Sequence, residues 1–139
     1  MHDQNEISVL QYSEDSNHFE ATSIYSHPDQ IWCLETSPTD PSLVVTSRQN
    51  VNRDNAISLW KMPKQEAEDL EEDQHNYHHD ILELNELSTF NKSKNPAIVN
   101  SVKWHNTENL LSSVDNATFT TWDIKDSQVS VSSISSLLL

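Results

Sequence analysis

Short runs of alternating apolar and polar residues recur along the whole chain and predict β-strands. The runs are rich in β-branched and aromatic residues, and Pro, Asp, Asn or Ser stands at most of their boundaries. Many short strands at close spacing predict an all-β architecture. The predicted strands cover residues 7–13, 19–25, 31–36, 43–47, 56–61, 81–90, 97–104, 110–114, 117–124 and 128–135.

One internal segment, residues 64–80, does not follow this alternation. Its sequence, KQEAEDLEEDQHNYHHD, holds seven acidic residues and one lysine. Glu, Ala and Leu favour a short helix, but the segment has no sustained apolar stripe, so a loop is the favoured interpretation. We therefore expect an acidic insertion between two strands.

The predicted strands on the two sides of the insertion follow one another in the same order. The run AISLWKM around Trp60 matches the run TFTTWDI around Trp122, and each is preceded by two shorter strands and followed by one more. The two tryptophans stand 62 positions apart, and subtracting the 17 residues of the insertion leaves 45. Four-stranded propeller blades repeat every 40–45 residues or so. The spacing therefore predicts a repeat of four-stranded units.

This repeat divides the chain into three parts. Residues 1–26 carry two strands, which fit the last two strands of a preceding unit. Residues 27–90 form one unit that contains the acidic insertion, and residues 91–139 form a second complete unit. The expected fold is an all-β propeller fragment of about two and a half four-stranded blades.

Charge and composition narrow the classes of function. The 139 residues carry 22 acidic and 8 basic side chains, giving a formal net charge of −14. Phosphate backbones and anionic lipids repel such a chain, so we expect no nucleic-acid binding and no membrane insertion, and a basic protein surface is the more natural partner. The start, MHDQNE, lacks the pattern of a signal peptide, and the single Cys33 favours a reducing compartment. These features predict a cytoplasmic protein.

Four tryptophans recur at equivalent or near-equivalent strand ends: Trp32, Trp60, Trp104 and Trp122. Large aromatic side chains at such positions predict packing between neighbouring units. Cys33 is expected to be a small core side chain rather than a nucleophile, because no His and carboxylate form a motif around it. The chain also lacks a phosphate-binding loop or a nucleophile motif, so we predict neither an enzyme nor a cofactor.

A cluster of histidines in the insertion supplies the candidate metal ligands His75, His78 and His79. Two histidines three or four positions apart share one face of a helix and can hold Zn²⁺. The sequence offers no fixed fourth ligand, so a solvated loop that is partly protonated near pH 6 is the favoured interpretation. An acidic, His-bearing loop that binds divalent metal or senses pH is the alternative function hypothesis.

The repeated unit resembles the WD-repeat β-propellers. TTWDI carries the Trp-Asp signature at Trp122 and Asp123, and SLWKM at residues 58–62 is a degenerate copy. The runs IWCLETSPTDPSLVVTSRQ and AISLWKMP more closely resemble the WD-repeat proteins that interact with the EARP and GARP tethering complexes. The resemblance covers roughly residues 6–135, so the chain corresponds to part of such a protein.

The resemblance implies a seven-bladed, non-catalytic scaffold that binds subunits of these complexes in endosome-to-Golgi retrograde transport and endocytic recycling. It implies a cytoplasmic protein associated with the trans-Golgi network and recycling endosomes. It also implies a hydrogen-bonded network of His, Asp and Trp, for which His27 and either Asp54 or Asp115 are the candidates in this chain. No Gly-His dipeptide precedes a strand in this chain. Because the chain contains no glycine, we expect residues such as Asn and Asp to occupy the turn positions that need positive φ.

Overall fold

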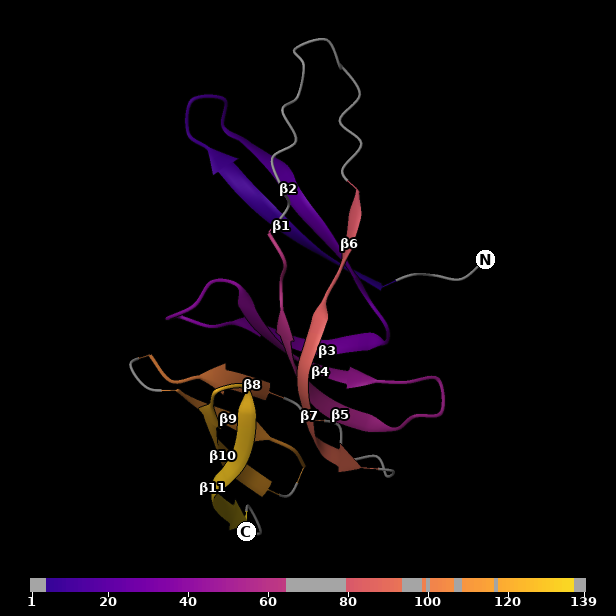
Figure 1. Ribbon diagram of the computed structural model, residues 1–139, viewed down its shortest axis with the longest axis vertical. Helices are drawn as coiled ribbons and strands as arrows, with labels where there is room; N and C mark the ends of the chain where they lie inside the picture. Colours follow the sequence, from indigo (N-terminus) through magenta and orange to yellow (C-terminus); the bar gives the residue numbers. More distant parts are fainter. Residues whose placement is uncertain are drawn as a thin grey trace.

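The computed structural model describes residues 5–64, 80–93, 99, 101–106, 109–116 and 118–136. These residues form eleven β-strands in three sheets, and no helix occurs among them. The three sheets follow one another along the long axis of the molecule (Figure 1). The prediction of an all-β architecture is confirmed.

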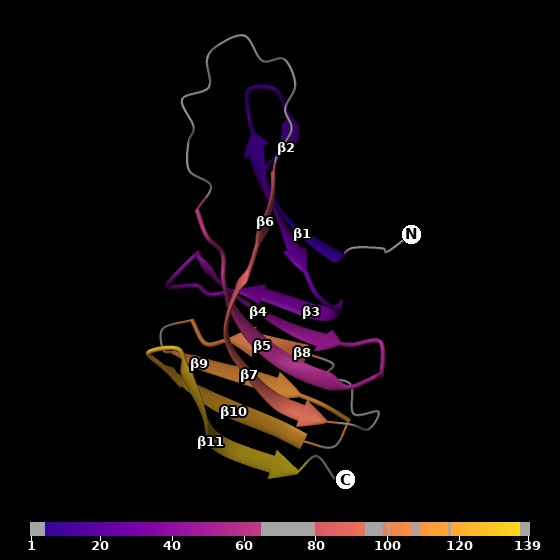
Figure 2. The same cartoon turned by 45° about the vertical axis from the view of Figure 1, so that its right-hand side comes forward.

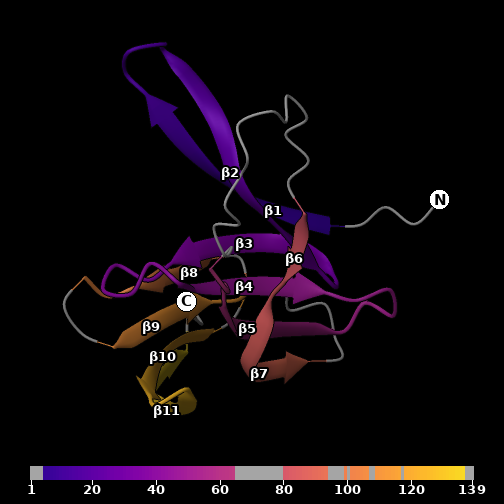
Figure 3. The same cartoon turned by 45° about the horizontal axis from the view of Figure 1, so that its top comes forward.

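The first sheet contains three strands in the order β1-β2-β6. The strands are β1 (Asn5–Ser13), β2 (His18–His27) and β6 (Ile81–Glu83). β1 and β2 form an antiparallel hairpin with a bulge at Val9/Leu10, and β6 joins the other side of β2 in parallel. The hairpin projects away from the two other sheets (Figure 3).

The second and third sheets have four antiparallel strands each, in orders β3-β4-β5-β7 and β11-β10-β9-β8. Their strands lie across the molecule in two neighbouring layers (Figure 2). The second sheet consists of β3 (Gln30–Thr36), β4 (Leu43–Gln49), β5 (Asn55–Lys61) and β7 (Asn85–Ser93). The third consists of β8 (Ser101–Trp104), β9 (Leu110–Val114), β10 (Thr118–Lys125) and β11 (Gln128–Ser136).

One predicted strand is divided in the structure. The run at residues 81–90 was expected to be a single strand, but Leu84 separates β6 from β7. β6 pairs with β2 in the first sheet, whereas β7 pairs with β5 in the second. Leu82 and Leu84 both pack against the buried cluster between these two sheets. This short segment therefore joins the first sheet to the second.

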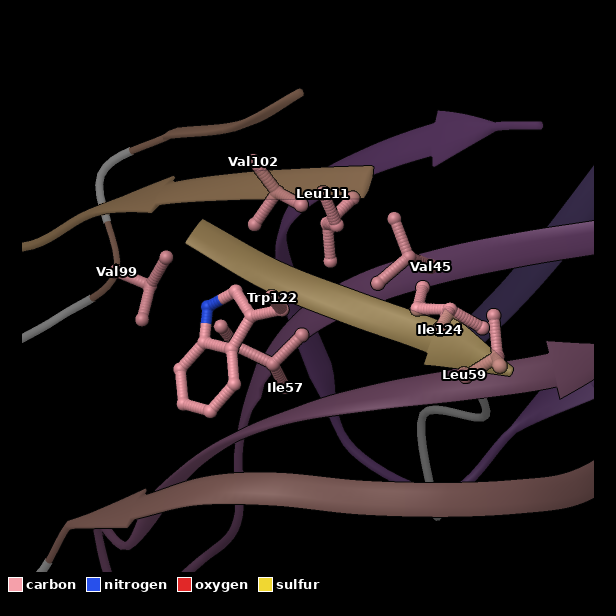
Figure 4. Close-up of a cluster of buried hydrophobic side chains, with 8 residues drawn as sticks. All are labelled: Val45, Ile57, Leu59, Val99, Val102, Leu111, Trp122 and Ile124. Atoms are coloured by element: carbon pink, nitrogen blue, oxygen red, sulfur yellow. The ribbon is translucent and has the colours of Figure 1, made fainter. Parts of the chain in front are cut away.

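The second sheet is apolar on both faces because successive side chains of a strand point to opposite sides. Val44 and Trp60 pack against Ile7 and Tyr25 of the first sheet. Their neighbours in sequence face the third sheet, and Figure 4 shows the side chains that converge there. This second cluster contains Val45, Ile57, Leu59, Val99, Val102, Leu111, Trp122 and Ile124.

Turns at positive φ are made without glycine. Asn17 between β1 and β2 (φ 51°) and Asp126 between β10 and β11 (φ 48°) confirm the expectation that Asn and Asp take such positions. Arg53 (φ 63°) and Ser127 (φ 66°) are less usual occupants. Next to Arg53, the side-chain oxygen of Asn50 accepts hydrogen bonds from the backbone N–H groups of residues 52 and 54, each at 2.9 Å. Asn50 thus holds the β4–β5 turn closed.

Candidate functional site

The polar residues between the first and second sheets form the candidate site. Val44, Thr46 and Arg48 alternate along β4 and share the face that looks toward the first sheet, because the side-chain period of a strand is two. Val44 lies in the apolar part of that face, and Thr46 and Arg48 extend it with polar groups. The end of β2 brings His27 to the same place, and the β2–β3 connection brings Asp29 there.

A buried hydroxyl links His27 to Trp60. The indole Nε1 of Trp60 donates to Oγ1 of Thr46 at 2.8 Å, and the same oxygen lies 3.0 Å from His27 Nε2. The two rings also meet edge to face, with centroids 5.2 Å apart. All three side chains are buried. Thr46 therefore serves as the common partner of both rings.

The hydrogen bonds of His27 indicate which ring nitrogen carries a proton. Its Nδ1 lies 2.7 Å from the carbonyl oxygen of Asp29, so Nδ1 carries the proton and donates there. In the neutral ring, Nε2 accepts from the Thr46 hydroxyl, whose own oxygen accepts from Trp60. Burial is the main reason that the pKa of His27 is lowered, and the nearby Arg48 charge lowers it further. The Asp29 carbonyl opposes this shift without reversing it.

The third sheet repeats the tryptophan contact. Trp122 donates from Nε1 to Oγ of Ser113 at 2.9 Å. In β5 and β4, Trp60 stands opposite Val44, two positions before Thr46. In β10 and β9, Trp122 stands opposite Leu111, two positions before Ser113. Both tryptophans thus lie on the third strand of their sheets at the same register, as the repeat predicted.

The hydrogen bonds described for His27 and Trp60 involve Thr46 and the backbone of Asp29 rather than the expected Asp54 or Asp115. Asp54 accepts a hydrogen bond from Asn50 Nδ2 at 3.2 Å, and Asp115 accepts one from the N–H of Thr118 at 2.7 Å. The group nearest to His27 Nδ1 is instead the main-chain carbonyl oxygen of Asp29, and the N–H of the same residue lies 3.3 Å from Nδ1. Thr46 was not predicted from the sequence. Its position was a usable signal, because Thr46 stands two residues after Val44, the residue opposite Trp60.

Arg48 contacts several neighbouring side chains on the more exposed side of the site. Its Nε donates to Ser58 Oγ at 2.8 Å, and its guanidinium forms ion pairs with Asp29 and, at 3.5 Å, with Glu86. The guanidinium carbon also lies 5.7 Å from the centre of the Trp60 ring, within the range of a cation–π contact. Arg48 therefore joins the β2–β3 connection to strands β5 and β7.

A surface hollow of about 360 Å³ adjoins Arg48. It is lined by Asp29, Arg48, Asn50, Asp54, Asn55, Ala56, Thr89 and Lys92. Asn55 is only 3% exposed, and its Nδ2 has no hydrogen-bond partner among the described residues. The lining carries two acidic and two basic residues, so its formal charges cancel. The hollow is lined by several residues with hydrogen-bonding groups.

The remaining tryptophans differ in their surroundings. Trp104 is half-buried against the core and donates from Nε1 to the carbonyl of Glu35 at 3.3 Å, across to the second sheet. Trp32 is 46% exposed, so the prediction that it packs between units is wrong. The pairing of β3 with β4 shifts between Ile31 and Cys33, which leaves Trp32 as the extra residue of a bulge on an edge strand.

Other predicted residues are placed as follows. Asp123 is half-buried on β10, with its carboxylate 3.7 Å from the Lys125 amine. Cys33 packs partly against the core, and its sulfur accepts a hydrogen bond from the N–H of Val102 at 3.3 Å. This contact fits the expected packing role.

The candidate metal ligands His75, His78 and His79 lie outside the described residues. Elsewhere in the part of the chain that the structure describes, no group of three or more His, Cys, Asp or Glu side chains could hold a metal ion. None of the described residues belongs to a helix long and apolar enough to cross a membrane.

The fold and site thus define an all-β protein of three sheets with a repeated tryptophan–hydroxyl contact. Comparison with protein-family models finds no match to this chain, and comparison with curated proteins finds none either. The WD-repeat resemblance remains a prediction.

Proposed function

We propose that the chain is part of a WD-repeat β-propeller that acts as a non-catalytic scaffold for protein–protein interaction. The observation that carries this proposal is the repeated contact of Trp60 with Thr46 and of Trp122 with Ser113. Each pair joins the third strand of a four-stranded sheet to the second at the same register. Stacked propeller blades require neighbouring sheets with equivalent strands and register, and the second and third sheets have this arrangement.

The division between core and surface supports a binding role. The second sheet buries residues on both of its faces, so its broad surfaces are used for packing between sheets. Turns and strand edges are left to contact other proteins, as in propellers and other repeat folds. The hollow beside Arg48 lies at such a place, next to the β4–β5 turn.

The proposed partners are protein subunits of the EARP and GARP tethering complexes, and the proposed location is cytoplasmic, at the trans-Golgi network and recycling endosomes. Both follow from the sequence resemblance. The formal charge of −14 adds a physical requirement, since an acidic scaffold associates fastest with a basic surface.

Binding of the whole chain to purified tethering complexes tests this proposal. We expect saturable binding, measured by surface plasmon resonance, that weakens as salt rises because screening reduces attraction between separated charges. The matched variant is Lys92→Gln, which removes an exposed charge from the lining of the hollow and leaves the contacts of Arg48 in place, so unchanged binding would place the partner elsewhere. Absence of binding by the folded chain to every subunit of both complexes would reject the proposal.

A further inference from the structure

A second hollow, of about 440 Å³, lies between the second and third sheets, each of which has four strands. It is formed where strands begin or end. Leu43 is the first residue of β4, Lys61 is the last of β5, and Trp104 is the last of β8. In a propeller, neighbouring blades cover the broad faces of a sheet, whereas strand ends and turns stay at the surface. Ligand pockets have volumes of about 300–1,000 Å³, so this hollow is large enough for a long side chain.

The more buried part of the lining is apolar. Leu43 and Leu87 come from the second sheet, and Trp104 and Ile124 come from the third. Ile124 belongs to the buried cluster of Figure 4, and Leu87 and Trp104 pack against that cluster. The indole of Trp104 is half-buried and is held by its hydrogen bond to the second sheet. We call this space the Trp104 hollow and define it by Leu43, Leu87, Trp104, Ile124 and Asp126.

The more exposed part of the lining carries three charged side chains, Asp40, Lys61 and Asp126. The amine of Lys61 lies 3.4 Å from the carboxylate of Asp40, so these two charges offset each other. Asp126 is exposed and forms no ion pair with any residue that the structure describes. The adjacent Lys125 amine lies 3.7 Å from the carboxylate of Asp123 instead. The lining therefore presents one negative charge that is not offset, on Asp126.

A tight turn fixes the backbone of Asp126 at the edge of the Trp104 hollow. Lys125 pairs with Gln128 across the hairpin, so Asp126 and Ser127 alone form the turn between β10 and β11. Both turn residues have positive φ, which is typical of a two-residue type I′ turn. Asn tolerates positive φ as Asp does, so the charge at this position can be removed without a change of the turn.

An apolar lining that includes an indole and one free carboxylate matches the chemistry of an arginine side chain. The methylene groups of arginine pack on apolar surface, while its charged end remains near water. Its planar guanidinium stacks on an aromatic ring and donates two hydrogen bonds to a carboxylate. A lysine amine has the same charge but lacks this planar geometry. A neutral side chain leaves Asp126 without a partner, and an acidic one is repelled by it.

We propose that the Trp104 hollow binds an arginine side chain of a partner protein. The guanidinium contacts Trp104 and the carboxylate of Asp126, and the methylene groups pack on Leu43 and Leu87. This inference rests on the proposed scaffold function and specifies one of its binding surfaces. The formal charge of −14 favours a basic partner in general, and the Trp104 hollow gives that preference a place on the molecule.

Titration of the whole chain with capped amino acids, followed by NMR, tests the inference. The probe is N-acetyl-arginine N-methylamide. The same derivatives of citrulline, lysine and leucine serve as controls, because citrulline keeps the shape without the charge, lysine keeps the charge without the plane, and leucine is only apolar. One side chain makes few contacts, so we expect the arginine derivative to bind with a dissociation constant of about 1 mM. We expect each control to bind roughly tenfold more weakly.

The signals that shift, together with two matched variants, identify the site of binding. The arginine derivative should shift the indole N–H signal of Trp104 and the amide signal of Asp126, and should leave the indole signal of Trp60 in place. Asp126→Asn should weaken binding roughly tenfold. Asp15→Asn removes the same charge from an exposed position between β1 and β2, so it should leave the affinity unchanged.

Three results would overturn the inference: equal binding of the citrulline or leucine derivative, shifts that leave out the Trp104 indole, or unchanged affinity in a folded Asp126→Asn variant. Equal binding of the leucine derivative would assign the hollow to an apolar side chain instead. If Asp126→Asn does not fold, the comparison of arginine with citrulline in the unmodified chain decides the question. Because the probes contain no tethering-complex subunit, this test can fail or succeed independently of the proposed function.

Discussion

Trp122 and Ser113 are joined by a hydrogen bond of 2.9 Å between the indole nitrogen and the hydroxyl oxygen, with both side chains buried. The bond connects the third strand of the third sheet to the second, and Trp60 and Thr46 make the same connection in the second sheet. In each case a large apolar ring is buried together with its one polar group, and a small hydroxyl residue satisfies that group. This pairing lets a tryptophan fill the space between two sheets.

Replacement of Ser113 tests the contribution of this bond. Ser113→Ala leaves a buried indole N–H without its acceptor, which should lower the free energy of unfolding by about 1–3 kcal/mol. Urea denaturation measures the change. Ser112→Ala, at the more exposed neighbouring position, should change stability by less than about 0.5 kcal/mol. In a Trp122→Phe background, Ser113→Ala should lower the free energy of unfolding much less. Equal losses in both backgrounds would contradict the hydrogen bond between Trp122 and Ser113.

The lowered pKa of His27 predicts a dependence of stability on pH. Because burial lowers the pKa of His27 in the folded state, the unfolded chain takes up a proton first as the pH falls below the ordinary histidine pKa of 6.5. Stability from this group is therefore complete above about pH 6.5 and is lost as the pH falls toward the lower folded pKa. Urea denaturation between pH 8 and pH 5 should show the loss in the wild type.

Two variants separate His27 from other titrating groups. His27→Gln should lack this component of the pH dependence, whereas His105→Gln, at an exposed position, should retain it. A His27→Gln variant with the wild-type pH profile would show that another group is responsible.

Replacement of Arg48 by lysine should destabilise the folded protein. Lysine keeps the charge but cannot donate to Ser58, Asp29 and Glu86 at once from a planar group. We expect Arg48→Lys to lower the free energy of unfolding by about 1.5–3 kcal/mol, the range for a hydrogen bond to a charged group. Lys61→Gln, which removes a more exposed ion pair with Asp40, should cost about 0–1 kcal/mol. If Arg48→Lys and Lys61→Gln lowered the free energy of unfolding equally, the charge of Arg48 would matter and its planar geometry would not.

The acidic insertion is predicted to affect association rather than folding. A variant with residues 65–79 replaced by a short Gly-Ser linker should keep its sheets, because the strands on both sides of the segment pair with β4 and β2. Removing its negative charge should slow binding to tethering-complex subunits and reduce the salt sensitivity of the rate. Stopped-flow measurements at two salt concentrations test this. Identical rates would show that the insertion takes no part, and insoluble protein would show that the core needs it.

Metal binding by the insertion is a separate question. The sequence places His75, His78 and His79 close together without a fixed fourth ligand, so we expect only weak binding of Zn²⁺. Calorimetric titration of the whole chain with zinc measures the affinity, and replacement of all three histidines by alanine provides the control. Tight binding that this replacement abolishes would favour the alternative function.

Sequence alone determined the strands and their repetition in this protein. Alternation of side chains is a local property, so the runs around Trp60 and Trp122 could be recognised as third strands without knowledge of their neighbours. The absence of glycine was equally visible, and Asn17 and Asp126 take positive φ as their short polar side chains allow.

Tertiary structure decided the features that depend on contacts between distant parts of the chain. The division of the run at residues 81–90 follows from the pairing of β6 with β2, and periodicity cannot identify the partner of a strand. Arg48 on β4 meets Asp29 of the β2–β3 connection and Glu86 of β7 only in the folded sheet, where β5 stands between β4 and β7. Trp32 is exposed on the edge strand β3, where it is the extra residue of a bulge that shifts the register. Each outcome was set by long-range pairing, since a local pattern fixes which side chains share a face but not what that face meets.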